Sequence, residues 1–368
     1  MKSVRIYFFY LLFFLILYLI IETLSFLSLK ILTKHGIYPA IDLIKQDFKD
    51  YNQIKDNQLG WISNSPHKNE YKARKIENHE LLTHNCMEVY GDSYTEGVDV
   101  NYQNSWPSLL SQKINCRVIN FGVEGYGTDQ SYLRYKSHEK ISKVVVINHF
   151  SENIVRNINQ FRNLIYPSEQ IKLKPRFILD EKKLILVPLP KLNNFGLDQI
   201  KKLNHEYFLP KNEKGIIKNI SYPFTLKLAK VLIFHHKFKA FFKQEPHSKQ
   251  FYSHDHKSNA LEITFQIMSE FNNLAIARNQ IPIITIIPHC KDIDYFVKNK
   301  KVPYQNLIDK IKLKKLLYLD FLPKIYSRDK NYKKFYFNNC KGQHFNEEGN
   351  ELIANIFYKF LKKNKILY

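Results

Sequence analysis

Four short segments of the sequence carry side chains that could perform acyl-transfer chemistry. Ser93 lies in the segment GDSYTEG, directly after an apolar run, and His344 lies in GQHFN near the end of the chain. A serine hydroxyl is a poor nucleophile at neutral pH unless a base lies within hydrogen-bond reach, and histidine is the commonest such base. The pair predicts nucleophilic attack on a carbonyl group, provided that the fold brings the two side chains together.

Two further segments offer hydrogen-bond donors, which this chemistry needs for the negatively charged oxygen that develops during the reaction. The segment NFGVEGYG contains glycines, whose missing side chains let backbone N–H groups approach a ligand closely. The segment NHFSEN offers side-chain amides. Taken singly, a glycine-rich loop is commonly only a tight turn, and a histidine before a helix is commonly a cap. Taken together and in this order, the segments indicate a catalytic site.

The elements that must position these residues are βα units. Short apolar runs occur at residues 87–90, 117–121, 143–148, 281–287 and 316–320, and amphipathic helices are predicted over 106–114, 128–140, 258–279 and 346–363. Buried runs that alternate with helices are typical of a parallel sheet covered on both faces. In such a sheet ligands bind at the carboxyl ends of the strands. Three of the four polar segments follow predicted strands directly, so we expect them at one edge of the sheet.

These four segments resemble the four sequence blocks of the SGNH, or GDSL-like, hydrolase family. The resemblance covers about residues 85–155 and 280–365. It implies a flavodoxin-like three-layer α/β/α sandwich and ester hydrolysis, or acyl transfer, through an acyl group bound to serine. Carried over residue by residue, it implies Ser93 as nucleophile and His344 as general base. It also implies an oxyanion hole formed by the Ser93 amide with Gly125 and Asn153.

The sequence departs from the family pattern next to the histidine. An aspartate usually stands two or three residues before it, where it orients the ring and stabilises the imidazolium, but here these positions are Gly342 and Lys341. In one interpretation a Ser93/His344 dyad works with a carbonyl or a more distant carboxylate orienting the ring. In the other, the protein is a catalytically degenerate, membrane-anchored protein for glycan binding or polysaccharide assembly. Asp92 is expected to brace the serine turn rather than to replace the missing acid.

The N-terminus predicts a membrane helix. Residues 6–21 are sixteen uninterrupted apolar residues, and after Glu22 and Thr23 the apolar pattern continues to Leu29. At about 1.5 Å per residue this stretch spans a hydrocarbon layer of about 30 Å. No small-residue cleavage site follows it, which favours an uncleaved signal anchor over a removed signal peptide. We therefore expect a single-pass membrane protein, anchored through residues 6–29, with its catalytic domain outside the cytoplasm and Glu22 reaching the membrane interface.

The sequence predicts three parts in the chain: the anchor and two parts that follow it. Residues 1–34 form the anchor, residues 35–85 a polar membrane-proximal stalk, and residues 86–368 the hydrolase-like domain, with an insertion at about 160–257. Within the insertion, residues 176–187 predict a hairpin, and residues 224–243 predict one apolar and basic helix. The insertion is interpreted either as a lid or subdomain beside the sheet or as a carrier of a membrane-surface helix.

The net charge of +22 raises the question of nucleic-acid binding. Only nine of the 56 basic residues are arginine, and the lysines are scattered, whereas base and phosphate recognition favours arginine. We expect no nucleic-acid partner. The basic surface is compatible with an acidic or glycan-containing substrate near the membrane, so the predicted partner is an acylated small molecule or polysaccharide. The sequence leaves the oligomeric state open.

Cysteines and histidines offer two further hypotheses. Cys290 with Cys340, and Cys86 with Cys116, could form disulfides in an oxidising compartment, the alternative being free buried thiols. A cluster near residue 250 has metal-ligating side chains but lies in a polar, loop-like stretch: it contains His247, His254, Asp255 and His256. We expect no cofactor and no metal.

Overall fold

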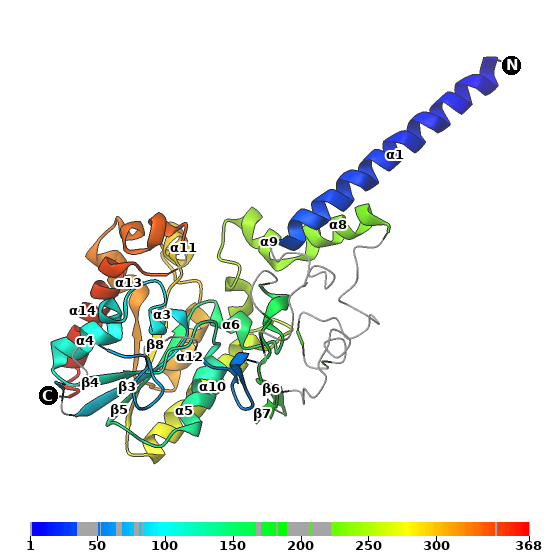
Figure 1. Cartoon of the computed structure of the whole chain (residues 1–368). Coiled ribbons are helices and arrows are strands. Elements are labelled where there is room, and N and C mark those ends of the chain that lie inside the picture. The colour runs from blue at the N-terminus through cyan, green and yellow to red at the C-terminus, as the bar shows by residue number, and fades with distance from the viewer. Residues whose placement is uncertain are drawn as a thin grey trace. The chain divides into compact units, whose positions relative to one another are not determined.

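The structure is a computed structural model, and its chain divides into two compact units. It describes residues 2–34, 51, 53–63, 68–76, 81–82, 84–166, 171–181, 183–189, 203, 206–207, 222–342 and 344–367. Unit 1 comprises Met1–Gln53, Phe161–Lys172 and Lys191–His247, and unit 2 comprises Ile54–Gln160, Leu173–Pro190 and Ser248–Tyr368. Figure 1 shows the N-terminal helix in unit 1 and the central sheet in unit 2.

Unit 2 is built on a five-stranded parallel sheet. Its strands are β3 (Asn85–Tyr90), β4 (Arg117–Asn120), β5 (Val144–Phe150), β8 (Ile281–Ile287) and β9 (Tyr318–Asp320). The spatial order is β4-β3-β5-β8-β9, and every pairing in it is parallel. Numbered along the chain this order is 2-1-3-4-5, the flavodoxin-like arrangement, whose ligand crevice lies where the strand order reverses. The predicted fold class and all five predicted strands are confirmed.

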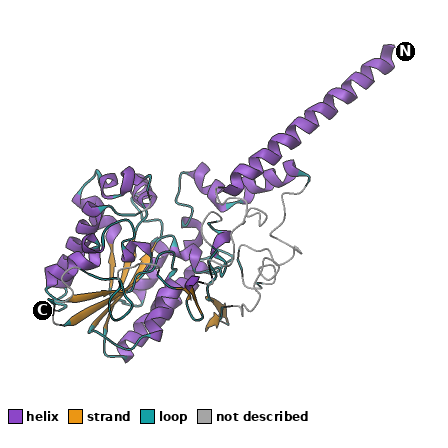
Figure 2. Cartoon of the chain, in the orientation of Figure 1, coloured by secondary structure: helices purple, strands orange, loops and turns teal. Residues whose placement is uncertain are grey.

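Helices cover both faces of this sheet, which gives three layers (Figure 2). They include α4 (Trp106–Ile114), α5 (Thr128–Ser137), α10 (Ala260–Ala277) and α14 (Glu347–Lys363). Helix α4 packs against α14, and α5 packs against α10. Because both faces are covered, the central strand β5 is buried at all seven positions, which explains the apolar run over its first four residues, Val144 to Ile147.

Helix α14 shows how the sequence fixes one of these elements. Leu352, Ile353, Phe357 and Leu361 form a buried stripe at helical spacing. The Asn346 side chain caps the N-terminus by accepting a hydrogen bond from the Gly349 N–H at 2.9 Å. Two glutamates lie in the first turn and two lysines in the last, which favours the helix dipole. The cap, two residues after His344, fixes the start of α14 at Glu347.

Other helices have no counterpart among the predicted elements. They are α3 (Ser93–Glu96), α6 (Asn153–Arg156), α11 (Cys290–Asn299), α12 (Gln305–Leu313) and α13 (Phe321–Arg328). Short 3₁₀ helices are η2 (Tyr102–Asn104), η3 (Arg162–Leu164), η4 (Lys249–Tyr252), η5 (Tyr332–Phe335) and η6 (Phe337–Cys340). Two of these helices, α3 and α6, begin with a candidate site residue.

Part of the segment predicted as a stalk packs within unit 2. It forms a small hairpin of β1 (Lys55–Asp56) and β2 (Gly60–Trp61). The Trp61 indole N–H donates to the Glu124 carbonyl at 3.0 Å, and the Tyr126 hydroxyl donates to the Trp61 carbonyl at 2.6 Å. Residues 35–50 lie outside the described residues, and the domain boundary at residue 85 stays a prediction.

The insertion contains the predicted hairpin, whereas its predicted single helix is wrong. The hairpin consists of β6 (Arg176–Asp180) and β7 (Lys183–Val187), which pair antiparallel in unit 2. Residues 224–243 form two helices in unit 1, α8 (Phe224–Phe234) and α9 (His236–Lys243). The break occurs because His235 has an extended backbone with ψ 130°, from which its ring accepts a hydrogen bond from the Lys237 N–H at 3.3 Å and caps α9.

The N-terminal helix α1 extends over Lys2–Lys34. Within it, Val4–Leu32 is long and apolar enough to cross a membrane. It is an element of unit 1 (Figure 1).

Candidate active site

Three side chains form a continuous hydrogen-bonded chain in unit 2. Ser93 Oγ lies 2.8 Å from His344 Nε2, and His344 Nδ1 lies 2.6 Å from Asp99 Oδ2. The fold thus brings Ser93 and His344 within hydrogen-bond reach, as the sequence predicts. It also adds a carboxylate on the far side of the ring, that of Asp99, which no sequence motif marks. A hydroxyl, an imidazole and a carboxylate in this order can activate the hydroxyl as a nucleophile.

The serine stands at a sharp turn after β3. Ser93 is the first residue of the four-residue helix α3, and Asp92 caps the helix by accepting a hydrogen bond from the Tyr94 N–H at 3.0 Å. The expectation that Asp92 braces this turn is confirmed. Gly97 ends the helix with φ +74°, a left-handed conformation that glycine adopts without steric cost. The chain then turns back, and Asp99 lies beside His344.

A buried arginine connects three of the site's segments. Arg156 Nη1 lies 3.2 Å from Asp92 Oδ2 and donates to the Tyr126 carbonyl at 3.0 Å. It therefore joins the serine turn, the glycine-containing loop and α6, which begins with Asn153. Burial raises the pKa of Asp92, and the positive charge of Arg156 opposes this rise.

The glycine-containing loop after β4 packs directly on α3. A side chain at Gly122 would place its Cβ 2.2 Å from the Glu96 backbone nitrogen, so only glycine fits there. The Glu124 N–H donates to Glu96 Oε2 at 2.6 Å, and Asn120 Nδ2 donates to the Thr95 carbonyl at 2.8 Å. These contacts fix the loop that carries Gly125, which has φ +80°.

Asn153 is fully buried at the start of α6. Its amide lies near the Asp92 carboxyl and lowers the pKa of that group. Within the part of the chain that the structure describes, neither polar atom of the amide makes a hydrogen bond of ordinary geometry. A buried amide in this state costs free energy unless a ligand atom supplies the missing partner.

No motif in the sequence marks Asp99, the acid that contacts His344, as a site residue. Several acidic residues follow the predicted strands, among them Asp92, Glu96, Glu124 and Glu152. The structure assigns Asp92 and Glu96 to bracing contacts, whereas the turn at Gly97 returns the chain so that Asp99 faces His344. Of the two interpretations of the missing aspartate, the geometry matches the one with a more distant carboxylate.

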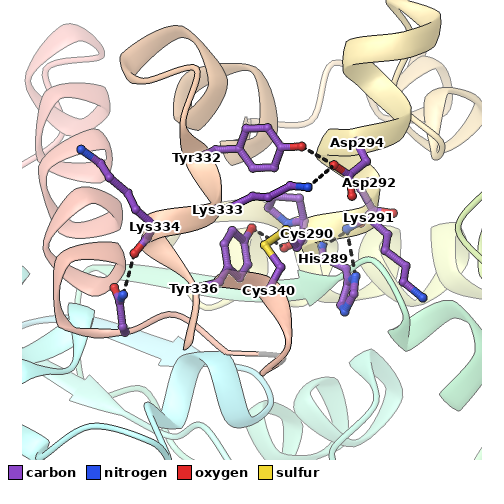
Figure 3. The surroundings of a disulfide bond; sticks show 12 residues. His289, Cys290, Lys291, Asp292, Asp294, Tyr332, Lys333, Lys334, Tyr336 and Cys340 are labelled. Carbon is purple, nitrogen blue, oxygen red and sulfur yellow. Dashed lines mark hydrogen bonds and ion pairs between the residues drawn. A yellow bond between two sulfur atoms is a disulfide. The ribbon is translucent and has the colours of Figure 1, made fainter. Parts of the chain in front are cut away.

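A disulfide holds the segment that carries the histidine (Figure 3). Cys290, the first residue of α11, is bonded to Cys340, which ends η6 four residues before His344. Beside the disulfide, the Tyr336 hydroxyl donates to the Pro288 carbonyl at 3.1 Å. The histidine segment is thereby tied at two points to the carboxyl end of β8.

The second predicted disulfide is also present. Cys86 in β3 is bonded to Cys116, which directly precedes β4, with their Cα atoms 6.0 Å apart. Both pairings proposed from the sequence are confirmed, and the alternative of free thiols is wrong. This second bond lies at the amino ends of its strands, away from the edge that carries Ser93.

A buried carboxyl group lies at the end of β8. Asp292 Oδ2 accepts hydrogen bonds from Ser151 Oγ at 2.5 Å and from the His289 N–H at 2.7 Å. Burial raises the pKa of Asp292 to about 7, and these two hydrogen bonds only partly oppose the shift. The Asp292 side chain also takes part in the cap of α11, the helix that begins with Cys290.

The histidine cluster near residue 250 does not assemble into a metal site. Among the described residues, no group of three or more His, Cys, Asp or Glu side chains could hold a metal ion. His247, His254, Asp255 and His256 are all described, and His256 Nδ1 instead lies 2.7 Å from Ser258 Oγ.

Comparisons with known proteins give likeness to solved structures alone. No protein-family model and no curated protein matches the sequence. Several of the similar structures are described as lipolytic proteins or esterases. A member of the lipolytic protein G-D-S-L family from Veillonella parvula is 12% identical, with 75% of this chain and 99% of that chain covered and a TM-score of 0.39.

Two further structures are similar over most of their length. The lipase/acylhydrolase from Enterococcus faecalis is 14% identical, with 76% of this chain and 96% of that chain covered and a TM-score of 0.38. The psychrotrophic esterase EstA from Pseudoalteromonas is 10% identical, with 76% and 97% covered and a TM-score of 0.38.

Proposed function

We propose that unit 2 is a serine ester hydrolase of the SGNH type. The observation that carries this proposal is the continuous chain Ser93 Oγ, His344, Asp99, with distances of 2.8 and 2.6 Å. Each contact supplies what a serine nucleophile requires, namely a base for its proton and a carboxylate that fixes the base in the correct tautomer.

The reaction would proceed in two halves. Ser93 Oγ attacks the ester carbonyl carbon while His344 Nε2 takes the hydroxyl proton, and Asp99 stabilises the imidazolium. When the tetrahedral intermediate collapses, the alcohol leaves with the proton from His344 and the acyl group remains on Ser93. Water then attacks the acyl carbonyl, with His344 again as base, and the acid and the free serine are released. A hydroxyl group that attacks in place of water would make the protein an O-acyltransferase.

The oxyanion hole in this proposal consists of the Ser93 and Gly125 amides and the Asn153 side chain. Two observations support it. The Ser93 N–H, at the first position of α3, donates no hydrogen bond within the described residues. The Asn153 amide is buried and has no hydrogen bond of ordinary geometry there. A substrate oxygen between these donors would accept a hydrogen bond from each of them.

The proposed substrate is a short acyl ester on a glycan or lipid-linked molecule, outside the cytoplasm. Two disulfides favour an oxidising compartment, and the helix Val4–Leu32 favours a site near a membrane. The alternative of a catalytically degenerate binding protein had its support in the absence of an aspartate before His344. Because the Asp99 carboxylate lies 2.6 Å from His344 Nδ1, the ring nitrogen that an orienting aspartate contacts, the active interpretation is favoured.

Hydrolysis of p-nitrophenyl esters of increasing acyl length tests the proposal. The full chain in detergent should hydrolyse the acetate or butyrate ester, and Ser93→Ala should remove the activity. Ser131→Ala is a matched control, because Ser131 is a buried serine in α5 whose hydroxyl only bonds its own helix. A folded chain that hydrolyses no ester, or a Ser93→Ala variant as active as the native chain, would overturn the proposal.

A further inference from the structure

Helix α1 has two parts that differ in their surroundings. The large apolar side chains from Val4 to Ile21 are all exposed, by 41% or more. These eighteen residues span about 27 Å at 1.5 Å per residue, close to the roughly 30 Å of a hydrocarbon layer. In the next turns Glu22, Ser25 and Leu29 are buried to 6% exposure or less. Their spacing of three and four residues places them on one face of the helix.

The buried face of α1 is covered by α8, which follows about 200 residues later. Glu22 caps α8 from outside: its carboxylate accepts hydrogen bonds from the Phe224 N–H at 2.7 Å and the Thr225 N–H at 3.3 Å. The hydroxyls of Ser25 and Thr225 lie 3.1 Å apart. A carboxylate at the first turn of an eleven-residue helix satisfies otherwise unpaired N–H groups and favours the helix dipole. The sequence predicts only that Glu22 reaches the membrane interface, but the structure shows that Glu22 also caps α8.

Contacts between aromatic residues also join α1 to the start of α8. The rings of Phe26 and Phe224 lie 5.0 Å apart, and the hydroxyls of Tyr18 and Tyr222 are in contact. Helix α8 thus begins beside Glu22, where the exposed apolar part of α1 ends, and runs along the last turns of α1 (Figure 1).

The exposed side chains of α8 and α9 are largely apolar or basic. Leu226, Ile233, Phe241 and Phe242 are between 59% and 74% exposed. Residues 224–243 contain five lysines and no acidic residue. Large exposed apolar side chains interspersed with lysines are typical of helices that lie in the interface of an anionic bilayer.

We propose that α8 and α9 form a second membrane-binding element, docked on a retained α1. The partner is the surface of a bilayer that contains anionic phospholipid: Phe241 and Phe242 enter the acyl boundary, and the exposed Lys230 and Lys243 contact the headgroups. The position of α8 beside Glu22 favours a bilayer over a protein partner. The eighteen exposed residues of α1 span the hydrocarbon layer, so Glu22 and the start of α8 lie at the bilayer surface. In this arrangement α1 is part of the folded structure of unit 1, since its removal would expose the first turn of α8.

Quenching by brominated phosphatidylcholine tests the proposal on the full chain. The chain is reconstituted in vesicles of phosphatidylcholine and phosphatidylglycerol, with Phe241→Trp or Phe242→Trp introduced singly. The native Trp61 and Trp106 are buried in unit 2 and provide the baseline, and Phe13→Trp in α1 is the positive control. We expect the added emission of Phe241→Trp and Phe242→Trp to fall about twofold or more in brominated vesicles.

Two outcomes would overturn the proposal. Quenching of Phe13→Trp without quenching at positions 241 and 242 would mean that lipid does not cover these side chains. Absence of quenching at Phe13→Trp would mean that α1 is not held in the bilayer.

The docking itself is tested by Glu22→Leu in the Phe241→Trp background. We expect this change to reduce the quenching at least about twofold, because the first turn of α8 loses its cap. Thr23→Leu is the matched control, since Thr23 Oγ1 bonds only the Leu19 carbonyl of its own helix. Equal quenching in the two variants would contradict the role of Glu22.

Discussion

Asp99 Oδ2 and His344 Nδ1 lie 2.6 Å apart although 245 residues separate them in the sequence. The acid comes from the loop that also carries Ser93, six residues earlier, and not from the segment before the histidine. The nucleophile and the acid are thus held by one short helix and its glycine cap, while the base reaches them from the other end of the chain. The Cys290–Cys340 disulfide holds the segment that carries the base. The nucleophile and the base are therefore held in place by different parts of the fold.

The Asp99 carboxylate should set the rate of catalysis with little effect on substrate binding. Asp99→Asn removes the charge that stabilises the imidazolium and permits the wrong tautomer of His344. Because the Asp99 side chain is 46% exposed, we expect kcat for ester hydrolysis to fall by about 10²- to 10⁴-fold, up to the loss known for a buried acid in serine proteases, with KM nearly unchanged. Asp309→Asn, on the exposed side of α12, should leave both constants unchanged. Native kcat in Asp99→Asn would exclude Asp99 as the orienting acid.

The Arg156–Asp92 pair should show strong coupling in unfolding measurements. Arg156→Leu leaves the buried Asp92 carboxylate without its counter-charge and should lower the free energy of unfolding by about 3 to 5 kcal/mol. In the double variant Arg156→Leu/Asp92→Asn the uncompensated charge is gone, so part of the loss should be recovered. Denaturant titrations of the native chain, the two single variants Arg156→Leu and Asp92→Asn, and the double variant measure this coupling. Equal stability of the double variant and Arg156→Leu would contradict the pairing.

The two disulfides should differ in their effect on activity but not in their effect on stability. They close loops of 50 and 30 residues, so each should stabilise the fold by about 4 kcal/mol. Cys290→Ser/Cys340→Ser also loosens the segment that holds His344 and should lower kcat about tenfold or more, since misplacement of a catalytic group is costly. Cys86→Ser/Cys116→Ser is the matched control and should keep native kcat. Similar kcat in the two double variants would show that the first bond does not position the histidine.

Asp292 should make the fold less stable as pH rises. Its pKa is raised by burial to about 7, so between about pH 4 and pH 7 the folded state holds a proton that the unfolded state has released. The unfolding free energy contributed by this group therefore falls across that window, by on the order of 4 kcal/mol. Asp292→Asn removes the effect, so its stability relative to the native chain should increase from pH 4 to pH 7 and then level off. Parallel stability profiles for the two chains would show that Asp292 titrates normally.

Much of the fold follows from local sequence patterns. The strand Ile281–Ile287 and the helix Trp106–Ile114 have the predicted bounds, because a continuous apolar run between helices can be buried only in a covered sheet. The segment order also predicted which side chains meet, since residues that follow parallel strands share one edge. This rule applies to the segments with Ser93 and Asn153, which follow β3 and β5, whereas the His344 segment follows no strand directly and precedes α14.

Other features depend on tertiary contacts that no local pattern encodes. The break at His235 separates α8 from α9 without a glycine or proline to mark it. Asp99 differs from the other acidic residues near the strand ends only in the path of the loop after Gly97. Glu22 is paired with a helix about 200 residues away, so its role in capping α8 could not be read from the apolar stretch around it.

Labelling by a fluorophosphonate probe tests the central claim most directly, because the probe reports an activated serine whatever the true substrate is. In the full chain, peptide mass analysis should find one phosphonylated residue, Ser93. The label should be absent from Ser93→Ala and His344→Ala, and its rate of incorporation should be strongly reduced in Asp99→Asn. A folded chain with intact disulfides that takes up no probe, or takes it up at another serine, would contradict the Ser93–His344–Asp99 site.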